Sequence, residues 1–237
     1  MKIEILFPEQ GYLYGDMGNV KYLKACLPDA EFIETTLEDV PAFAEGDVDL
    51  VYMGYLSEDM QRKVIEKLRP YKERIQEMIQ SKVCILFTGN AMEVLFKEIV
   101  KGDDVTEGLD IFDFTAIIDP KRRYVGNYSG QFNERKIVGC KIQEAVTYGA
   151  NQDCCFGKGI RGMGINRSTI YEGIRKNNFI GTYLIGPLLI MNPYFTHFLF
   201  ARMGIAKPRL AFSGALKEAY GQRVEEFENK STVMEIV

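Results

Sequence analysis

The sequence predicts an α/β protein of the doubly wound class, with a mostly parallel central sheet. Its first half alternates short apolar segments with helical patterns, the order expected of parallel strands joined by helices. Residues 83–87 (Val-Cys-Ile-Leu-Phe) are apolar throughout, which is typical of a strand buried on both faces of a parallel sheet. The turn Thr88-Gly89-Asn90 ends this segment sharply, and a helical pattern follows it.

The elements of the first half can be placed in order. Residues 2–7 alternate apolar and polar side chains before Pro8 and are expected to form the first strand. A helix is expected over 20–25, with Asn19 or Asp16 as its cap, followed by strands at 31–34 and 49–54. A long helix opens at 57–59, and Pro70 is expected to kink or split it. A further helix is expected to start over 91–96.

Past residue 105 the chain becomes rich in strand patterns. Strands are expected at 112–118, 123–125, 136–142, 145–148 and 179–185. Residues 151–166 are polar and rich in glycine and are expected to form a loop, whereas 193–203 should form a closing helix. The charged tail from Lys217 is consistent with either a helix or a frayed end. No internal repeat or linker divides the chain, so we expect a single domain over 1–237.

Composition excludes several classes of function. With 237 residues and 46% hydrophobic residues, the chain can bury a core without disulfides or metal. A net charge of −4 argues against a broad basic surface for nucleic acid. The cysteines are odd in number and match neither a CxxC motif nor a zinc spacing, and one histidine, His197, leaves no imidazole-rich metal site. We therefore expect no metal, no cofactor and no nucleic-acid partner.

The sequence also shows no pattern that is typical of a targeting signal. The N-terminus has no cationic leader followed by an apolar core. The most apolar stretch, 179–200, is interrupted by Gly186-Pro187 and Asn192-Pro193, which does not fit a membrane span. The sequence thus predicts a soluble, reduced, cytoplasmic protein with no membrane partner.

The turn at 88–90 is the first candidate for chemistry. A sharp strand-to-helix turn can lift a nucleophile above the sheet edge, and the backbone amides that follow can stabilise an oxyanion. A turn of this length is equally typical of an ordinary βα connection. Pattern alone leaves both interpretations open.

Motifs along nearly the whole chain resemble one family. Residues 13–19 read Leu-Tyr-Gly-Asp-Met-Gly-Asn and resemble L-Y-G-D-R-G-N, and 181–189 read Gly-Thr-Tyr-Leu-Ile-Gly-Pro-Leu-Leu and resemble G-T-Y-L-H-G-P-L-L, with Asn-Pro following at 192–193. Between them, 123–127 resemble R-L-I-G-N and 171–173 contain the E-G pair. The chain thus resembles the triad-type (class I) glutamine amidotransferases of the cobyric acid synthase group, especially the glutaminase subunits of lipid II isoglutaminyl synthases. The resemblance implies a flavodoxin-like, three-layer α/β domain.

The residues that carry the family's chemistry differ in this sequence. Its elbow reads I-C-G-G-Y-Q-L-L-G, and the matching run here, 88–96, places the cysteine nucleophile on Gly89, or on Thr88 if the register slips by one. Glycine offers no thiolate, and Thr88 would need a neighbouring base. The family's histidine falls on Ile185, which cannot take a proton.

Two further parts of the family's site differ. The G-G-G-Q-D loop, which supplies the oxyanion site, becomes Gly-Tyr-Leu-Ser-Glu at 54–58, so that Tyr55 and Leu56 replace two glycines. The arginine that helps to hold glutamine aligns with Val146, which cannot hold a carboxylate. We expect a partly closed, apolar crevice at the family's site, lined by eight residues: Tyr55, Leu56, Thr88, Gly89, Asn90, Glu93, Val146 and Ile185.

Other reactive residues are better explained by structure. Cys84 lies inside an apolar strand and is expected to be a core residue, and Cys154 and Cys155 are expected to be loop thiols without a histidine nearby. His197 is expected to be a surface histidine or a packing histidine. Glu93 replaces the family's elbow glutamine and is expected to cap or solvate the helix start. The cluster at 121–123 (Lys-Arg-Arg) is expected to be a solvated turn, with contact to an acidic partner as the alternative.

These observations favour a non-catalytic role. The sequence predicts a glutamine amidotransferase-like protein that keeps the fold and the docking surface for a synthetase; by resemblance, that partner is a Mur-ligase-like enzyme. One alternative is an active amidotransferase subunit with a relocated nucleophile. Another is a small-molecule sensor that uses the remodelled pocket at the strand ends, where ligands bind in open α/β sheets.

Overall fold

A six-stranded sheet forms the centre of the molecule in the computed structural model, which describes residues 1–9, 11–81 and 83–236. Its strand order is β13-β14-β4-β3-β1-β2, and all neighbours are parallel except the edge pair β13–β14. The strands are β1 (Lys2–Leu6), β2 (Glu31–Thr35), β3 (Leu50–Met53), β4 (Cys84–Thr88), β13 (Ile174–Lys176) and β14 (Phe179–Thr182). The predicted flavodoxin-like α/β class is confirmed.

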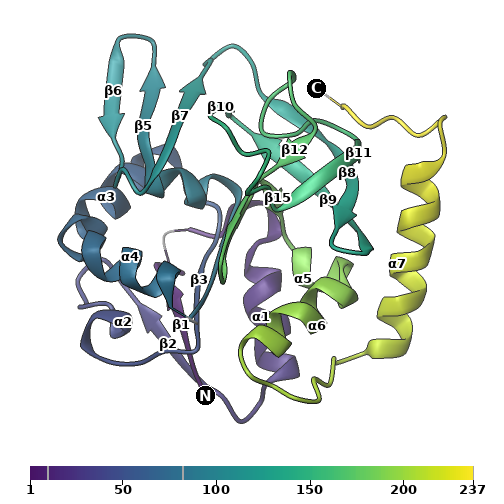
Figure 1. Ribbon diagram of the computed structural model, residues 1–237, viewed down its shortest axis with the longest axis horizontal. Helices are drawn as coiled ribbons and strands as arrows, with labels where there is room; N and C mark the ends of the chain where they lie inside the picture. Colours follow the sequence, from purple (N-terminus) through teal and green to yellow (C-terminus); the bar gives the residue numbers. More distant parts are fainter. Residues whose placement is uncertain (10, 82, 237) are drawn as a thin grey trace.

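Helices cover both faces of this sheet (Figure 1). One face carries α2 (Ala42–Glu45), α3 (Glu58–Leu68) and α4 (Lys72–Gln80); the other carries α1 (Met17–Cys26), α5 (Leu188–Met191) and α6 (Pro193–Arg202), with α7 (Ser213–Glu228) outside them. Alternation along the strands separates the two cores: Val51 and Ile85 pack with α3 and α4, whereas Tyr52 and Leu86 pack with α1, α5 and α6. The result is a three-layer arrangement.

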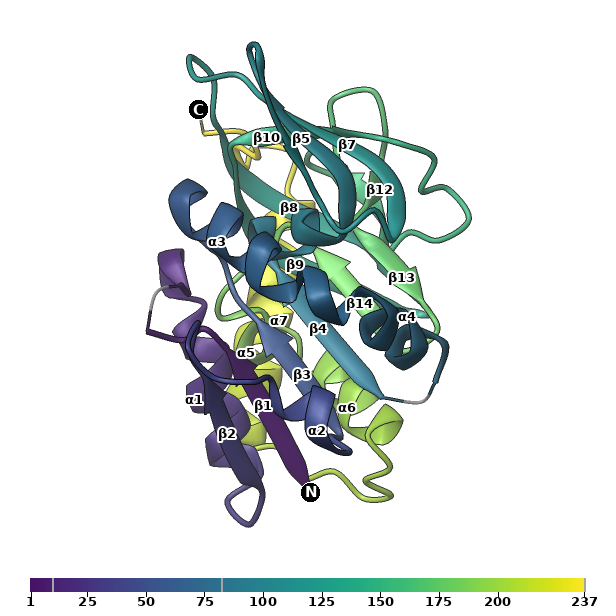
Figure 2. The ribbon, with the colours of Figure 1, turned by 90° about the vertical axis from the view of Figure 1, so that its left-hand side faces the viewer.

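Two smaller sheets lie beyond the carboxyl end of the parallel strands (Figures 1 and 2). The first has the order β10-β7-β5-β6 and the second β12-β11-β8-β9-β15. Their strands are β5 (Phe96–Lys101), β6 (Asp104–Glu107), β7 (Phe112–Ile118), β8 (Tyr124–Phe132), β9 (Arg135–Gln143), β10 (Ala145–Tyr148), β11 (Gly157–Arg161), β12 (Tyr171–Glu172) and β15 (Leu184–Ile185). Short 3₁₀ helices span Leu13–Gly15, Arg69–Tyr71 and Gly89–Leu95. Among the described residues, no helix is both long and apolar enough to cross a membrane.

Local sequence signals explain several elements. The side chain of Ser57 accepts a hydrogen bond from the Met60 amide and caps α3. Pro70 splits the predicted long helix into α3 and α4, with a 3₁₀ turn between them. The predicted strands at 112–118 and 145–148 have the observed bounds, and the tail from Lys217 continues the helix α7.

Four sequence predictions were wrong in type or extent. The helix expected at 91–96 is a 3₁₀ helix, after which the chain enters β5 at Phe96. The loop expected at 151–166 contains β11, and the short strand expected at 123–125 continues to Phe132 as β8. The strand expected at 179–185 is divided between β14 and β15, which belong to different sheets. In each case tertiary pairing overrides the local pattern.

A fully buried ion pair joins two strands of the five-stranded sheet, β9 and β12, and a hydrogen bond connects it to β14 of the central sheet. Lys141 on β9 lies 2.7 Å from the carboxylate of Glu172, and both side chains are 0% exposed. Lys141 Nζ also donates to the carbonyls of Met163 and Gly164, and Glu172 accepts from the Thr182 hydroxyl at the end of β14. Burial lowers the pKa of Lys141, and the neighbouring Glu172 opposes this shift. The charges are retained because every polar atom of the pair has a partner.

We predict that Lys141→Met destabilises the fold by about 3–5 kcal/mol, because it leaves the Glu172 carboxylate buried without its cation. Lys136→Met is the matched control, because it removes a half-exposed ion pair with Glu228 from the same strand. A surface pair of this kind contributes about 0–1 kcal/mol. Denaturant unfolding of both variants measures the difference, and equal losses would contradict the structural role assigned to the buried pair.

Candidate functional site

The turn after β4 keeps the backbone geometry expected of an elbow. Thr88 ends the strand in an extended conformation, and Gly89 follows with φ +63°, in the left-handed region that residues with a side chain rarely adopt. Both residues are buried. The segment that follows is the 3₁₀ helix Gly89–Leu95 rather than an α-helix. The turn is therefore sharp, but no α-helix starts behind it.

The aromatic ring of Tyr55 fills the space in front of this turn. A Cβ atom added to Gly89 would lie 2.9 Å from Tyr55 Cγ and 3.0 Å from Tyr55 Cβ, and closer still to Cδ2. Tyr55 is 1% exposed, and the ring of Tyr14 packs edge-on against it at a centroid distance of 4.9 Å. A side chain at position 89 would therefore overlap the tyrosine ring.

The backbone amides of the 55–56 segment already have acceptors inside the protein. Tyr55 N donates to Asp16 Oδ2 at 2.8 Å, and Leu56 N donates to Asn90 Oδ1 at 2.8 Å. The Asn90 amide also donates to the Leu56 carbonyl at 2.9 Å, which closes a reciprocal pair. In the family's site this loop supplies the donors for an oxyanion, and in this chain they bind side chains instead.

The carboxylate of Asp16 connects the segments around the turn. It accepts a hydrogen bond from the Thr88 hydroxyl at 2.7 Å and others from the amides of Tyr55 and Gly186. Burial raises the pKa of Asp16 to about 6, although these three hydrogen bonds lower it. Asp16 is thus a buried, weakly acidic group beside the candidate nucleophile Thr88, which is itself 0% exposed.

Ile185 lies near the same point from another sheet. It is a buried residue of β15, where it pairs with Cys140 of β9. The next residue, Gly186, donates its amide to Asp16, which also accepts from Thr88. Ile185 precedes Gly186 and Gly89 follows Thr88, and both of these neighbours donate a hydrogen bond to the Asp16 carboxylate.

Glu93 is buried, which corrects the expectation that it caps or solvates a helix start. Its carboxylate accepts from Gln61 Nε2 at 2.9 Å and from the Tyr183 hydroxyl at 2.7 Å. Burial raises the pKa of Glu93 to about 7, while these two hydrogen bonds lower it. Tyr183 also bonds Thr147, so Glu93 links the elbow segment to β10. The side chain is a polar member of the core.

Val146 lines a cavity of about 230 Å³ that is distinct from the elbow. The cavity wall includes Arg122, Arg123 and Arg167, and none of the elbow residues Tyr55, Leu56, Thr88, Gly89 and Ile185 contributes to it. The Lys-Arg-Arg cluster at 121–123 is exposed, as expected, and two of its members help to form this wall. The structure thus separates Val146 from the other residues predicted to share its pocket.

The five cysteines are free, and burial opposes the reactivity of four of them. Burial raises the pKa of the Cys84 thiol to about 12 and raises the pKa values of Cys140, Cys154 and Cys155. His197 lies on α6, where partial burial and the charge of Lys217 lower its pKa. Within the described ranges, no group of three or more His, Cys, Asp and Glu side chains could hold a metal.

Sequence reasoning missed the central position of Asp16, which it considered only as a helix cap. The structure gives the Asp16 side chain no capping bond to the backbone of α1: its Oδ2 accepts from Tyr55 and Thr88, and its Oδ1 accepts from the side chain of Asn19 at 3.3 Å. A signal was present: Asp16 is one of the residues that match the family's first motif. The partners lie 39 and 72 residues away in sequence, beyond the reach of any local pattern.

The buried carboxyl of Glu93 predicts a pH dependence of stability. The folded state holds the proton up to about pH 7, whereas the ordinary pKa of an exposed glutamate is 4.5. The unfolded chain releases the proton first, so stability is full below pH 4.5 and falls by up to about 3 kcal/mol as the pH rises to 7. We expect the thermal midpoint to fall from pH 5 to 7.5 and to fall less in Glu93→Gln. Glu45→Gln, at an exposed site, is the control; equal slopes in all three proteins would contradict the prediction.

Comparison with known proteins places these features in context. No protein-family model matches the chain. Among curated proteins, the GatD subunit of lipid II isoglutaminyl synthase (glutamine-hydrolysing) from Streptococcus pneumoniae is 24% identical over 219 residues, covering 90% of this chain and 79% of that relative. The GatD subunit from Staphylococcus aureus is 27% identical over 193 residues, covering 79% and 77%.

Solved structures show the same fold at low sequence identity. A glutamine amidotransferase superposes with a TM-score of 0.58 and 11% identity, covering 85% of this chain and 98% of that one. PurLQS from Thermotoga maritima gives 0.52 and 9%, covering 93% and 97%. The resemblance found in the motifs is confirmed: the chain is homologous to GatD subunits of lipid II isoglutaminyl synthase, and its fold is that of the glutamine amidotransferases.

Proposed function

We propose that this glutamine amidotransferase-like protein does not hydrolyse glutamine and acts as a non-catalytic partner of a Mur-ligase-like synthetase. The observation that carries the proposal is the packing of the Tyr55 ring against Gly89. By motif alignment, Gly89 stands where the family has its cysteine nucleophile. The ring occupies the volume that the attacking side chain and its substrate would need.

Acyl transfer from glutamine needs an attacking group, a proton carrier and donors for the oxyanion. Gly89 and Ile185 supply neither the first nor the second. The amides of Tyr55 and Leu56 donate to Asp16 and Asn90 and so have no free hydrogen for an oxyanion. Three separate requirements are thus unmet at the family's site, which supports the non-catalytic interpretation over a single compensated substitution.

One observation favours a second candidate, an active glutaminase with a relocated nucleophile. Thr88 donates to Asp16 at 2.7 Å, and a carboxylate with a pKa of about 6 is a suitable general base. Against this candidate, Thr88 is 0% exposed and its oxygen also bonds the hydroxyl of Tyr52 at 3.0 Å. A substrate could reach it only after the side chains that bury it had moved.

The partner is inferred from the relatives. The two curated relatives are named as subunits of lipid II isoglutaminyl synthase, so each works in an assembly. Retention of the fold without the chemistry is what a docking role requires, because a docking surface depends on the scaffold and not on the elbow. We therefore propose a Mur-ligase-like protein as the partner and cytoplasmic cell-wall amidation as the setting.

We predict no ammonia release from glutamine above the rate without protein, either for the chain alone or for its complex with a co-expressed Mur-ligase-like protein from a neighbouring gene. The double variant Gly89→Cys with Ile185→His should also stay inactive, because Tyr55 still fills the site. Co-purification of the two chains without turnover is the expected result. Turnover that Thr88→Val abolishes would establish the relocated nucleophile instead, and failure of the two chains to co-purify would overturn the scaffold role.

A second prediction tests the filled turn directly. Gly89→Ala should destabilise the fold by about 2–4 kcal/mol, because it adds overlap with Tyr55 to the strain of a left-handed alanine. Gly102→Ala is the matched control: Gly102 has φ +60° and open space around its Cβ position, so it measures the strain alone, about 1 kcal/mol.

In a Tyr55→Ala background, Gly89→Ala should lower the free energy of unfolding only by the cost of the backbone strain, because the overlapping ring is gone. Chemical denaturation of the four proteins of this double-mutant cycle gives the coupling between positions 55 and 89. A cost at Gly89 equal to that at Gly102, with no coupling to Tyr55, would show that the ring does not occupy the site.

A further inference from the structure

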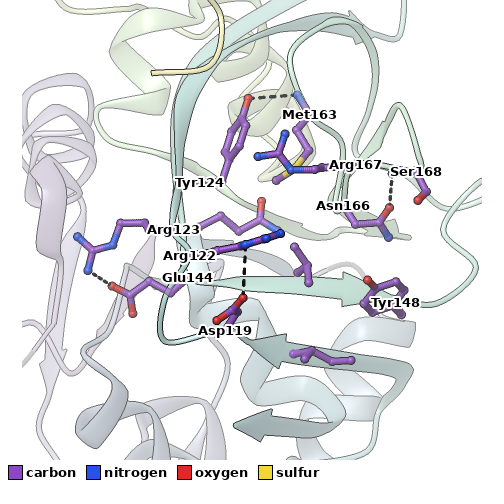
Figure 3. A pocket seen from close by; sticks show the side chains of 13 residues that line it. Asp119, Arg122, Arg123, Tyr124, Glu144, Tyr148, Met163, Asn166, Arg167 and Ser168 are labelled. Carbon is purple, nitrogen blue, oxygen red and sulfur yellow. Dashed lines mark hydrogen bonds and ion pairs between the residues drawn. The ribbon is translucent and has the colours of Figure 1, made fainter. Parts of the chain in front are cut away.

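The cavity beside β10 has a wall that no part of the amidotransferase reaction explains. Its volume is about 230 Å³, and it is lined by side chains from β8, β10 and the segments 119–123 and 163–168. Figure 3 shows Tyr124 and Tyr148 on opposite sides, with Arg122 and Arg167 reaching toward the space between them from different segments. The cavity thus combines aromatic walls with two guanidinium groups.

A buried polar atom at this cavity lacks a partner. Gln143 lines the cavity and is 2% exposed. Its Nε2 donates to the Ile165 carbonyl at 2.8 Å, which fixes the orientation of the amide, and its Oε1 accepts no hydrogen bond among the described residues. An unpaired buried acceptor is unfavourable, so a donor from a bound molecule would stabilise the site.

The arginines differ in how strongly they are held. Arg123 turns away to Glu144, 2.6 Å from its carboxylate. Arg167 forms a two-point pair with Glu235 of the C-terminal segment. Arg122 is 87% exposed and lies 3.7 Å from Asp119, beyond a normal hydrogen bond. Its guanidinium therefore retains free donors at the cavity mouth, and such planar donors match a carboxylate or a phosphate.

We propose that this cavity binds a small anion whose flat or apolar body carries an N–H donor. The anionic group would bind Arg122 with support from Arg167, the body would lie between Tyr124 and Tyr148, and the N–H would donate to Gln143 Oε1. The site is separate from the elbow, so it does not depend on the proposed non-catalytic function. Phosphate and carboxylate share this chemistry, and the experiment below distinguishes them.

The test compares each anion with its neutral counterpart by calorimetric titration of the full chain. Adenosine monophosphate against adenosine examines the phosphate, and N-acetyl-phenylalanine against its amide examines the carboxylate. At least one anion should bind about tenfold more tightly than its counterpart, because one charge-assisted contact contributes roughly 1.4 kcal/mol. Arg122→Ala should remove this preference, and Gln143→Met should weaken binding of both members of the pair.

Arg209→Ala is the control, since it removes an exposed arginine outside the cavity lining. Arg122→Ala changes an exposed side chain and keeps the test valid if Gln143→Met fails to fold. The outcome for each pair assigns the anionic group. Binding of neither anion at millimolar concentration would overturn the proposal, and so would binding that Arg122→Ala leaves unchanged.

Discussion

A single buried carboxylate, that of Asp16, holds together the segments at the carboxyl edge of the central sheet. It accepts from Thr88 at the end of β4, from Tyr55 after β3 and from Gly186 after β15. No cation pairs with it among the described residues, and burial raises its pKa to about 6 although the hydrogen bonds from these donors lower it. Because a buried carboxylate is costly without these donors, the three segments cannot separate independently. The turn, the filled crevice and the position of Ile185 all depend on this constraint.

The turn at Gly89 has the backbone conformation of an elbow, and the side chain of Tyr55 packs directly against it. Gly89 remains in the left-handed region, and glycine is the residue that adopts it without strain. The ring of Tyr55 occupies the space that a side chain at position 89 would need, and an aromatic ring buried in this way contributes roughly 2–3 kcal/mol. The reciprocal bonds between Asn90 and Leu56 then fix the loop that carries the tyrosine. The turn is thus packed against Tyr55, and the loop that carries this tyrosine is held by hydrogen bonds to Asp16 and Asn90.

Charged residues of the cavity beside β10 lie near Tyr55. Tyr55 is connected to this region: burial raises the pKa of its hydroxyl, and the nearby charges of Glu144 and Glu93 raise it further while Arg123 lowers it. Glu144 and Arg123 also line the cavity beside β10. Tyr55, which fills the space in front of Gly89, therefore lies within electrostatic range of the cavity beside β10. Any ligand that rearranged the Arg123–Glu144 pair would change the field at Tyr55.

The sequence by itself determined the layered fold, because alternating and continuous apolar patterns report burial directly. The buried strand at 83–87 and the helix split at Pro70 follow from local chemistry, and the ordered motifs from residue 13 to residue 193 identified the family. Gly89 and Ile185 predict a site without a thiol and an imidazole at these two positions. The side chains that surround them could be read only from the folded chain. The ring of Tyr55 at Gly89, the burial of Glu93 and the separation of Val146 from the elbow depend on contacts between residues tens of positions apart. The segment at 91–96 shows the same limit: its helical pattern appears only as a 3₁₀ helix that ends at Leu95, and Phe96 pairs with Phe112 on β7, since non-local hydrogen bonds outweigh a short helix's own propensity.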